Sequence, residues 1–160
     1  MLFTGHSLGA ALATFAAMDL ADTLTASNVK YYLYTYGCPR LGNGAFSDYI
    51  YTKFTYANNN RVVHYDDLVA HLPDRITTLA QYKHAGDEVW YHEKLFSISK
   101  YQICKNYQGS WGENKECSGS LYVKMGIEAH KVYLGYPISA MCNKYSHSRI
   151  PHHIESFLNE

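Results

Sequence analysis

The sequence lacks any apolar run close to the ~20 residues that a membrane-spanning helix needs. It also lacks a cationic leader followed by an apolar stretch, and it has no block of basic residues. Basic and acidic residues balance at 14 each, which argues against a nucleic-acid partner. Only four cysteines are present and none forms a C-x-x-C pair, so we expect no metal site.

What remains is the composition of a globular protein. The 160 residues are 47% hydrophobic and 18% charged, which predicts one domain with a substantial core. Apolar periodicity and turn residues predict the following elements. They are a helix over 7–27, a strand over 31–36, a helix over 45–54, a strand over 61–65, an antiparallel hairpin of 82–85 with 89–91, a strand over 94–104, a loop over 108–120 and a helix over 128–134.

The most informative stretch is G-H-S-L-G at residues 5–9. An apolar strand (Leu2–Thr4) precedes it and an alanine-rich helix follows, which is the context of a nucleophile elbow. We expect both flanking glycines to be required because a Cβ at either would collide with its surroundings. We expect an apolar helix face formed by Leu8, Ala11, Leu12, Phe15 and Met18. The alternative is an ordinary strand-to-helix turn in which Ser7 caps the helix.

A nucleophilic serine needs a base to accept its proton and an acid to orient that base. The acid should follow a strand at the catalytic edge of the sheet. Asp66 and Asp67 both follow the predicted strand 61–65 and cannot be separated by spacing, whereas Asp48 and Asp74 fit less well. The alternative for either residue is a solvated turn carboxylate.

The candidate bases are the histidines downstream of these aspartates. They are His71, His84, His92, His130, His147, His152 and His153. His84 and His92 lie on expected strands beside aromatic residues, where packed or surface histidines are common. His130 lies between a glycine-rich loop and a short amphipathic helix, from which it can return to the serine, so it is the first choice and His153 the second.

Several ordered motifs resemble those of one family. F-T-G-H-S-L-G-A-A-L-A at 3–13, Y-G-C-P-R-L-G-N at 36–43, R-V-V at 61–63 and D-L-V-A-H-L-P at 67–73 are similar to motifs of the class 3 (fungal-type) triacylglycerol lipases. Y-K-H at 82–84, E-V-W-Y at 88–91, C-S-G-S at 117–120 and E-A-H-K-V-Y-L-G at 128–135 continue the resemblance. It implies an α/β-hydrolase fold: a mostly parallel sheet with flanking helices and an antiparallel hairpin late in the chain.

The resemblance also implies roles for particular residues. Ser7 would be the nucleophile, Asp67 the acid and His130 the base, while the backbone N–H of Leu8 would bind the oxyanion. A disulfide between Cys104 and Cys117 is implied in the same way.

Cys142 matches a family cysteine that bonds to the N-terminal region, and Cys38 has no counterpart. The alternative is that all four cysteines are reduced thiols of a cytosolic protein.

The resemblance runs from Met1 to about Cys142. We therefore expect a partial α/β-hydrolase domain over 1–142 and a polar tail over 143–160. An elbow strand belongs inside a sheet, yet the later strands can supply only one of its flanks. This predicts the C-terminal part of a longer protein, or a truncated gene model. The resemblance implies that the family's upstream strands, its lid helix and its second oxyanion donor are not in this chain.

Together these features predict a serine esterase that acts on lipid acyl esters, at a lipid–water interface and without a cofactor. Secretion or a lumenal location is expected by analogy with the family. Two alternatives stay open: a phospholipase A1 or feruloyl-type esterase of the same fold, and a catalytically inactive fragment that serves as a binding module.

Overall fold

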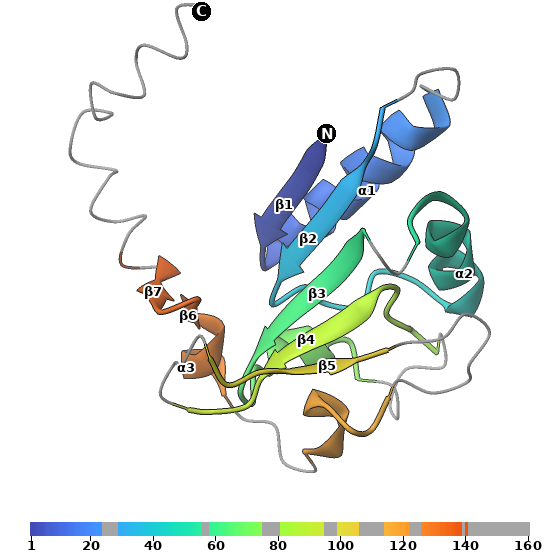
Figure 1. Cartoon of the computed structure of the whole chain (residues 1–160). Helices are drawn as coiled ribbons and strands as arrows, with labels where there is room; N and C mark the ends of the chain where they lie inside the picture. The colour runs from blue at the N-terminus through green and yellow to red at the C-terminus, as the bar shows by residue number, and fades with distance from the viewer. Residues whose placement is uncertain are drawn as a thin grey trace, which may run out of the picture.

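The computed structural model describes residues 1–23, 29–55, 58–74, 81–94, 99–105, 114–121, 126–138 and 140. Its centre is a five-stranded sheet in which the strands follow one another in chain order (Figure 1). The strands are β1 (Leu2–His6), β2 (Tyr32–Tyr36), β3 (Asn59–His64), β4 (Asp87–Tyr91) and β5 (Gln102–Cys104). The pairs from β1 to β4 are parallel and β5 is antiparallel to β4. The predicted α/β class with a mostly parallel sheet is confirmed.

The elbow strand β1 lies at one edge of this sheet. It pairs with β2, residue Leu2 opposite Tyr32 and His6 opposite Tyr36, and among the described strands it has no second neighbour. This arrangement agrees with the expectation that the later strands flank β1 on one side only.

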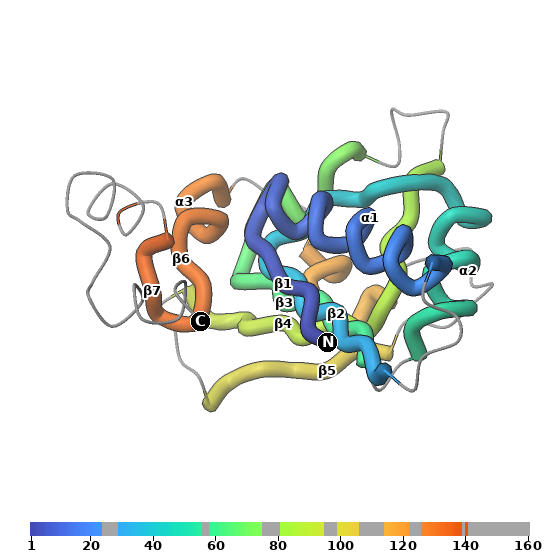
Figure 2. The backbone as a smooth tube through the Cα atoms, turned by 90° about the horizontal axis from the view of Figure 1, so that it is seen from above, coloured from blue at the N-terminus to red at the C-terminus, as the bar shows by residue number. Residues whose placement is uncertain are grey.

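Two helices pack beside each other on the sheet, α1 (Leu8–Thr23) and α2 (Gly44–Lys53) (Figure 2). They share one apolar cluster with β2, formed by Ala17, Met18, Leu33, Ile50 and Phe54. The N-terminus of α2 is capped by Asn43, whose Oδ1 accepts a hydrogen bond from the Phe46 N–H at 3.0 Å. This cap explains why the helix begins one residue before the predicted Ala45.

The predicted apolar face of α1 is only partly correct. Its buried residues are mainly small ones, together with Met18, whereas Leu8, Leu12 and Phe15 are 70%, 61% and 46% exposed. The cause is the close approach of α1 to β1, which brings the Gly9 carbonyl over Gly5 and favours alanine on the packed face. Hydrophobic size alone does not reveal this preference.

A second apolar cluster lies at the β4 side of the sheet. The cross-strand pair Val63 and Trp90 packs there with Ala70, Cys104 and Cys117. Cys104 and Cys117 form the disulfide that the family resemblance implied.

The predicted hairpin of 82–85 with 89–91 is wrong. Lys83 instead forms an isolated antiparallel bridge with Gly42, and β4 pairs in parallel with β3. Gly86 is not a hairpin-turn residue. It has a φ of +90°, and a Cβ there would lie 2.5 Å from Oδ1 of Asn59, so glycine is needed for this close approach.

Antiparallel pairing does occur late in the chain, in other places. The predicted strand 94–104 is described as a strand only over β5, and the predicted helix 128–134 is the short α3 (Ile127–His130). A hairpin follows, β6 (Val132–Tyr133) and β7 (Tyr136–Pro137), with Leu134 and Gly135 at positive φ in its turn. That turn explains why the helix stops early.

The α3 helix and this hairpin lie beyond the carboxyl ends of the parallel strands (Figure 1). Two short 3-10 helices complete the described elements, η1 (Val69–His71) and η2 (Ser118–Ser120). Cys142, His147, His152, His153 and the predicted tail over 143–160 lie outside the described residues.

Candidate active site

Ser7 lies in a sharp turn between β1 and α1. Its φ is +58°, a left-handed conformation that a residue with a side chain rarely adopts. The Ser7 N–H donates to the Tyr36 carbonyl at 3.0 Å, which ties the turn to β2. A Cβ on Gly5 would lie 2.2 Å from the Gly9 carbonyl oxygen, so glycine is required at position 5. The same expectation is wrong for Gly9, which lies in the exposed first turn of α1 with open space around it.

Asp67 follows β3 and is fully buried. Its Oδ1 accepts a hydrogen bond from the Val69 N–H at 2.8 Å, and its own N–H donates to the His64 carbonyl. Asp66 points elsewhere: its carboxylate lies over Gly126, where a Cβ would come within 2.0 Å of Oδ1. The structure therefore separates the two aspartates that spacing could not.

His130, at the C-terminus of α3, lies between the serine and this aspartate. Its Nε2 is 2.8 Å from Oγ of Ser7, and its Nδ1 is 2.9 Å from Oδ2 of Asp67. The ionised carboxylate can only accept, so Nδ1–H donates to it and Nε2 is left to accept the Ser7 hydroxyl proton. The three side chains form a hydrogen-bonded row in the order serine, imidazole, carboxylate.

A further donor reaches the buried carboxylate. The Tyr133 hydroxyl, on β6, donates to Oδ2 of Asp67. Burial by itself would raise the pKa of the Asp67 carboxyl, but the hydrogen bonds from His130 and Tyr133 outweigh it and hold the pKa below its ordinary value. Burial and the neighbouring Asp67 charge raise the pKa of Tyr133 well above its ordinary value, so this hydroxyl keeps its proton. Asp67 is thus held as an anion beside His130.

Leu8 is the first residue of α1 and directly follows Ser7. The N–H groups in the first turn of a helix have no intrahelical partner, and the helix dipole places positive charge there. Leu8 therefore contributes the first N–H of this helix, directly after Ser7 in the chain.

A second serine–histidine contact lies nearby. Nε2 of His71 is 3.1 Å from Oγ of Ser118, and Nδ1 of His71 is 2.8 Å from the backbone carbonyl of Asp67. This pair differs from Ser7–His130 in two respects. Ser118 is 2% exposed, and His71 faces a carbonyl where His130 faces a carboxylate. The His71–Ser118 pair can brace the Asp67 loop but is closed to a substrate.

The other candidates do not join the row. The buried His84 bonds through Nε2 to the Ala70 carbonyl at 2.8 Å. His92 is exposed beside Trp90, Asp48 lies on α2 and Asp74 is exposed. None of them contacts Ser7 or His130.

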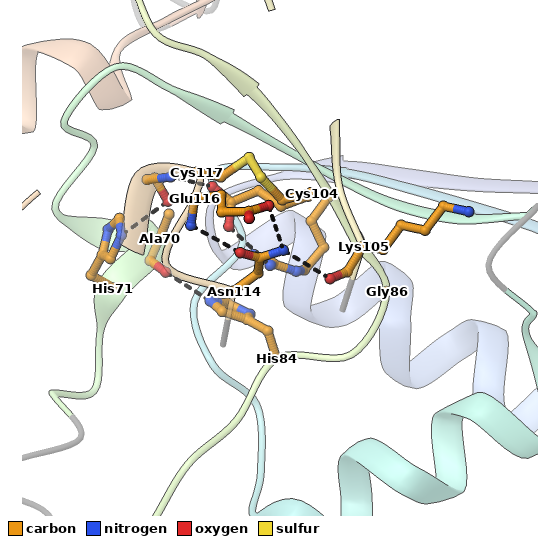
Figure 3. A network of polar contacts seen from close by, with 12 residues as sticks. Ala70, His71, His84, Gly86, Cys104, Lys105, Asn114, Glu116 and Cys117 are labelled. Carbon is orange, nitrogen blue, oxygen red and sulfur yellow. Dashed lines mark hydrogen bonds and ion pairs between the residues drawn. A yellow bond between two sulfur atoms is a disulfide. The ribbon is translucent and has the colours of Figure 1, made fainter. Parts of the chain in front are cut away.

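The disulfide lies in a polar network close to η1 (Figure 3). The Asn114 side chain donates to the Lys105 carbonyl at 3.2 Å and accepts from the Glu116 N–H at 2.9 Å. One residue beyond Cys117, the Ser118 N–H donates to Glu88, whose carboxylate pairs with Arg61 at 3.2 Å. The disulfide is thus connected through Ser118 to the loop that carries Asp67.

Three residues beside this hydrogen-bonded row were not among the sequence candidates: His6, His64 and Tyr133. His6 stands inside the G-x-S-x-G motif and Tyr133 lies three residues after His130. The sequence therefore places these two residues next to the predicted site. Their roles could not be predicted because their contacts are with residues far away in the chain.

Within the described ranges, no three or more histidine, cysteine or acidic side chains are grouped so that they could hold a metal. Of the helices in those ranges, none has the length and apolar character that crossing a membrane requires.

Comparison with known proteins adds independent information. Residues 1–76 match the family described as "Lipase (class 3)". The chain is 35% identical to a lipase of Rhizomucor miehei over 135 residues, which cover 82% of this chain and 34% of that protein. It is also 35% identical to a secreted mono- and diacylglycerol lipase of Fusarium solani, covering 81% and 36% of the two chains.

Solved structures agree. Lipase II from Rhizopus niveus superimposes with a TM-score of 0.70 at 33% identity, covering 85% of this chain and 47% of that one. A triacylglycerol lipase whose catalytic centre is described as a serine protease triad gives a TM-score of 0.66 at 34% identity, over 84% and 47% of the chains. The chain thus spans about a third of these curated relatives and about half of these solved chains.

Proposed function

The chain belongs to the class 3 lipase family, and from this membership and its serine–imidazole–carboxylate row we propose that it is a serine carboxylic-ester hydrolase acting on lipid acyl esters. The observation that carries the proposal is the pair of contacts made by His130, to Ser7 at 2.8 Å and to Asp67 at 2.9 Å. An imidazole so placed can take a proton from the hydroxyl while the carboxylate stabilises the resulting imidazolium.

The acylation step follows from this geometry. Oγ of Ser7 attacks the ester carbonyl carbon as its proton moves to Nε2 of His130. The tetrahedral oxyanion receives a hydrogen bond from the Leu8 N–H. When the intermediate collapses, the carbon–oxygen bond to the alcohol breaks, and the alkoxide takes the proton from His130. The products of this step are the free alcohol and an acyl ester of Ser7.

Deacylation repeats the sequence with water. His130 accepts a proton from a water molecule while the water oxygen attacks the acyl carbon. His130 then gives this proton to Oγ of Ser7 as the ester bond to Ser7 breaks. A carboxylic acid leaves and the serine is regenerated. Every proton moves among Ser7, His130, the leaving alcohol and water, so the scheme requires no cofactor.

The finer part of the proposal is the substrate. The relatives are named as lipases, including a mono- and diacylglycerol lipase and a triacylglycerol lipase, which favours acyl glycerols over phospholipids or feruloyl esters. Leu8, Leu12 and Phe15 are large apolar side chains exposed on the helix that begins beside Ser7, and this supports uptake at a lipid–water interface. The disulfide and the secreted relative support an oxidising, extracellular or lumenal location.

The test is covalent labelling together with ester hydrolysis. A fluorophosphonate should label the wild-type protein at Ser7, and a short-chain nitrophenyl ester should be hydrolysed. The Ser7→Ala variant should lose both, with a fall in kcat of at least about 10³-fold. Ser118→Ala is the matched control, because it removes the other serine that faces a histidine and should remain labelled.

A folded wild-type protein that is neither labelled nor active would overturn the proposal. That result would favour a binding module that retains the fold.

A further inference from the structure

The imidazoles of His6 and His64 lie beside the catalytic histidine segment. Nε2 of His6, on β1, is 2.8 Å from the carbonyl oxygen of His130. Nδ1 of His64, on β3, is 3.0 Å from the carbonyl oxygen of Ala129. Two successive carbonyls at the end of α3 are therefore bound by imidazoles from two different strands.

The chemistry of a carbonyl fixes the direction of both bonds. A carbonyl oxygen only accepts, so the ring nitrogen facing it must carry the proton. His6 must be protonated at Nε2 and His64 at Nδ1 for these bonds to form. Nε2 of His64 also faces a carbonyl, that of Glu93 at 3.2 Å. An imidazole that carries one proton can donate to only one of two carbonyls, and the shorter of these contacts is the one to Ala129.

The short helix cannot place His130 by itself. It has four residues, one turn, and a helix of that length is not stable without tertiary contacts. The imidazoles that bind its last two carbonyls come from β1 and β3, the strands that also lead to Ser7 and Asp67. His6 is adjacent to Ser7, and its ring packs against that of His130 at a centroid distance of 4.5 Å.

The surroundings of the two imidazoles fit a neutral donor role for His6. The pKa of His6 is lowered, mainly by burial and in smaller part by the neighbouring His130 ring. The hydrogen bond to the His130 carbonyl and the charge of the Asp67 carboxylate act in the opposite direction. The Tyr133 ring packs against both imidazoles, at centroid distances of 5.3 Å from His6 and 6.0 Å from His64. His64 is 3% exposed, so a bond lost there is not replaced by bulk water.

We propose that His6 and His64 are positioning residues of the active site, which hold the His130 imidazole between Ser7 and Asp67 by donating hydrogen bonds to the carbonyls of His130 and Ala129. This inference rests on the proposed hydrolase function. In this proposal neither residue contacts the substrate or takes part in the proton transfer. Their effect passes through the backbone on which His130 is mounted.

Amide substitutions test it because they distinguish the two ring nitrogens. The side-chain nitrogen of glutamine reaches about as far as Nε2 of histidine, and that of asparagine about as far as Nδ1. His6→Gln should therefore keep most of kcat on a soluble nitrophenyl ester, within about threefold, and His6→Asn should lose about tenfold or more. The order should reverse at the other site, where His64→Asn keeps activity and His64→Gln loses it.

The reversed order is the diagnostic result. The losses should appear in kcat with little change in KM, because the misplaced group acts on the chemical step. A purely structural role would make both amides at one site equally harmful, with a loss that follows the fall in thermal stability. Equal losses within each pair, or none, would overturn the inference.

Imidazole ¹⁵N spectra of the histidine-labelled wild-type protein provide a second measurement that does not need activity. They should show the proton of His6 on Nε2 and that of His64 on Nδ1. The ring signals of His130 should shift in His6→Asn and in His64→Gln. They should stay near their wild-type positions in His6→Gln and in His64→Asn. The opposite tautomers, or an unmoved His130, would overturn the inference even if the enzyme proved inactive, whereas inactivity alone would count only against the proposed function.

Discussion

The hydroxyl of Tyr133 donates a hydrogen bond to Oδ2 of Asp67, the same carboxylate oxygen that faces Nδ1 of His130. The Tyr133 oxygen also accepts from the His64 N–H at 3.3 Å. One buried phenol thus links the Asp67 carboxylate to the end of β3, the strand that Asp67 follows. This tyrosine completes the environment of a carboxylate that has no exposed surface.

Replacing this phenol should raise the pKa of Asp67 and weaken the fold. Tyr133→Phe removes a donor from a buried anion and an acceptor from the His64 N–H, so the free energy of unfolding at neutral pH should fall by about 1.5–3 kcal/mol. A carboxyl whose pKa is lowered on folding stabilises the protein above its unfolded pKa of about 3.9, and this contribution is lost as the pH falls through the folded pKa. In the variant the folded pKa lies closer to the unfolded value, so the loss of stability on acidification should be smaller and should end at a higher pH.

Urea unfolding as a function of pH measures both effects of Tyr133→Phe. Acid unfolding curves that coincide for the two proteins would contradict the assignment of Tyr133 as a donor to Asp67.

The two adjacent aspartates should differ sharply in their effect on activity. Asp67→Asn leaves the shape of the site intact but offers an amide to His130, which favours the wrong tautomer, and kcat should fall by about 10³–10⁴-fold. Asp66→Asn changes a neighbouring carboxylate that lies over Gly126 and should lower kcat by less than about tenfold. Steady-state hydrolysis of a nitrophenyl ester measures both. Similar losses in the two variants would argue against Asp67 as the acid.

The elbow and the order of strands and helices could be predicted from the sequence because the signals are local. Strand, glycine, serine and helix are contiguous at residues 2–13, so neighbours in the chain fix the turn. Asp66 and Asp67 could not be separated because spacing does not determine which way a turn after a strand faces. Here a positive φ of 43° at Tyr65 and the close approach of Gly126 determine it.

What remained hidden depends on contacts between distant parts of the chain. His6 and His130 are separated by 124 positions, and no periodicity reports that one binds the carbonyl of the other. The exposed face of α1 was missed for a related reason. Its packing depends on how closely the helix approaches β1, which favours alanine, whereas hydrophobic patterning points to leucine and phenylalanine.

Burial of His6 should make the stability depend on pH in the weakly acidic range. Its pKa is lower in the folded protein than in the unfolded chain, so between these two values the unfolded chain binds more protons. The free energy of unfolding should therefore decrease as the pH falls below about 6.5. His6→Gln removes the titrating group and should reduce this slope. Parallel stability curves for wild type and variant, measured by urea unfolding, would show that His6 does not contribute.

Reducing the disulfide should destabilise the protein and loosen the Asp67 loop. Cys104 and Cys117 are 13 positions apart, and closing a loop of that size contributes roughly 3 kcal/mol in the chain-entropy model. Reduction also frees Ser118, which contacts His71, whose Nδ1 binds the carbonyl of Asp67. Dithiothreitol should lower both the melting temperature and kcat. The double variant Cys104→Ala with Cys117→Ala is the control, and an equal response to dithiothreitol in that variant would exclude this disulfide as the cause.

Leu12 is 61% exposed on α1. Replacing it with a polar residue should lower activity on lipid aggregates and leave activity on dissolved esters unchanged. Transfer of an exposed leucine side chain to an apolar phase is favourable by about 2 kcal/mol, so Leu12→Ser should weaken adsorption to an emulsion by roughly tenfold or more. The helix keeps its packed face, since the buried residues of α1 are Ala10, Ala11, Thr14, Ala17 and Met18. Hydrolysis of a soluble nitrophenyl ester should therefore stay near wild type.

The control for Leu12 is Asp19→Ser, an exposed polar position on the same helix, which should change neither activity. Rates on a triacylglycerol emulsion and on the soluble ester, measured for the three proteins, separate the effects. A loss of equal size on both substrates would mean that Leu12 supports the fold, and an unchanged emulsion rate would remove this face of α1 from the proposed contact with lipid.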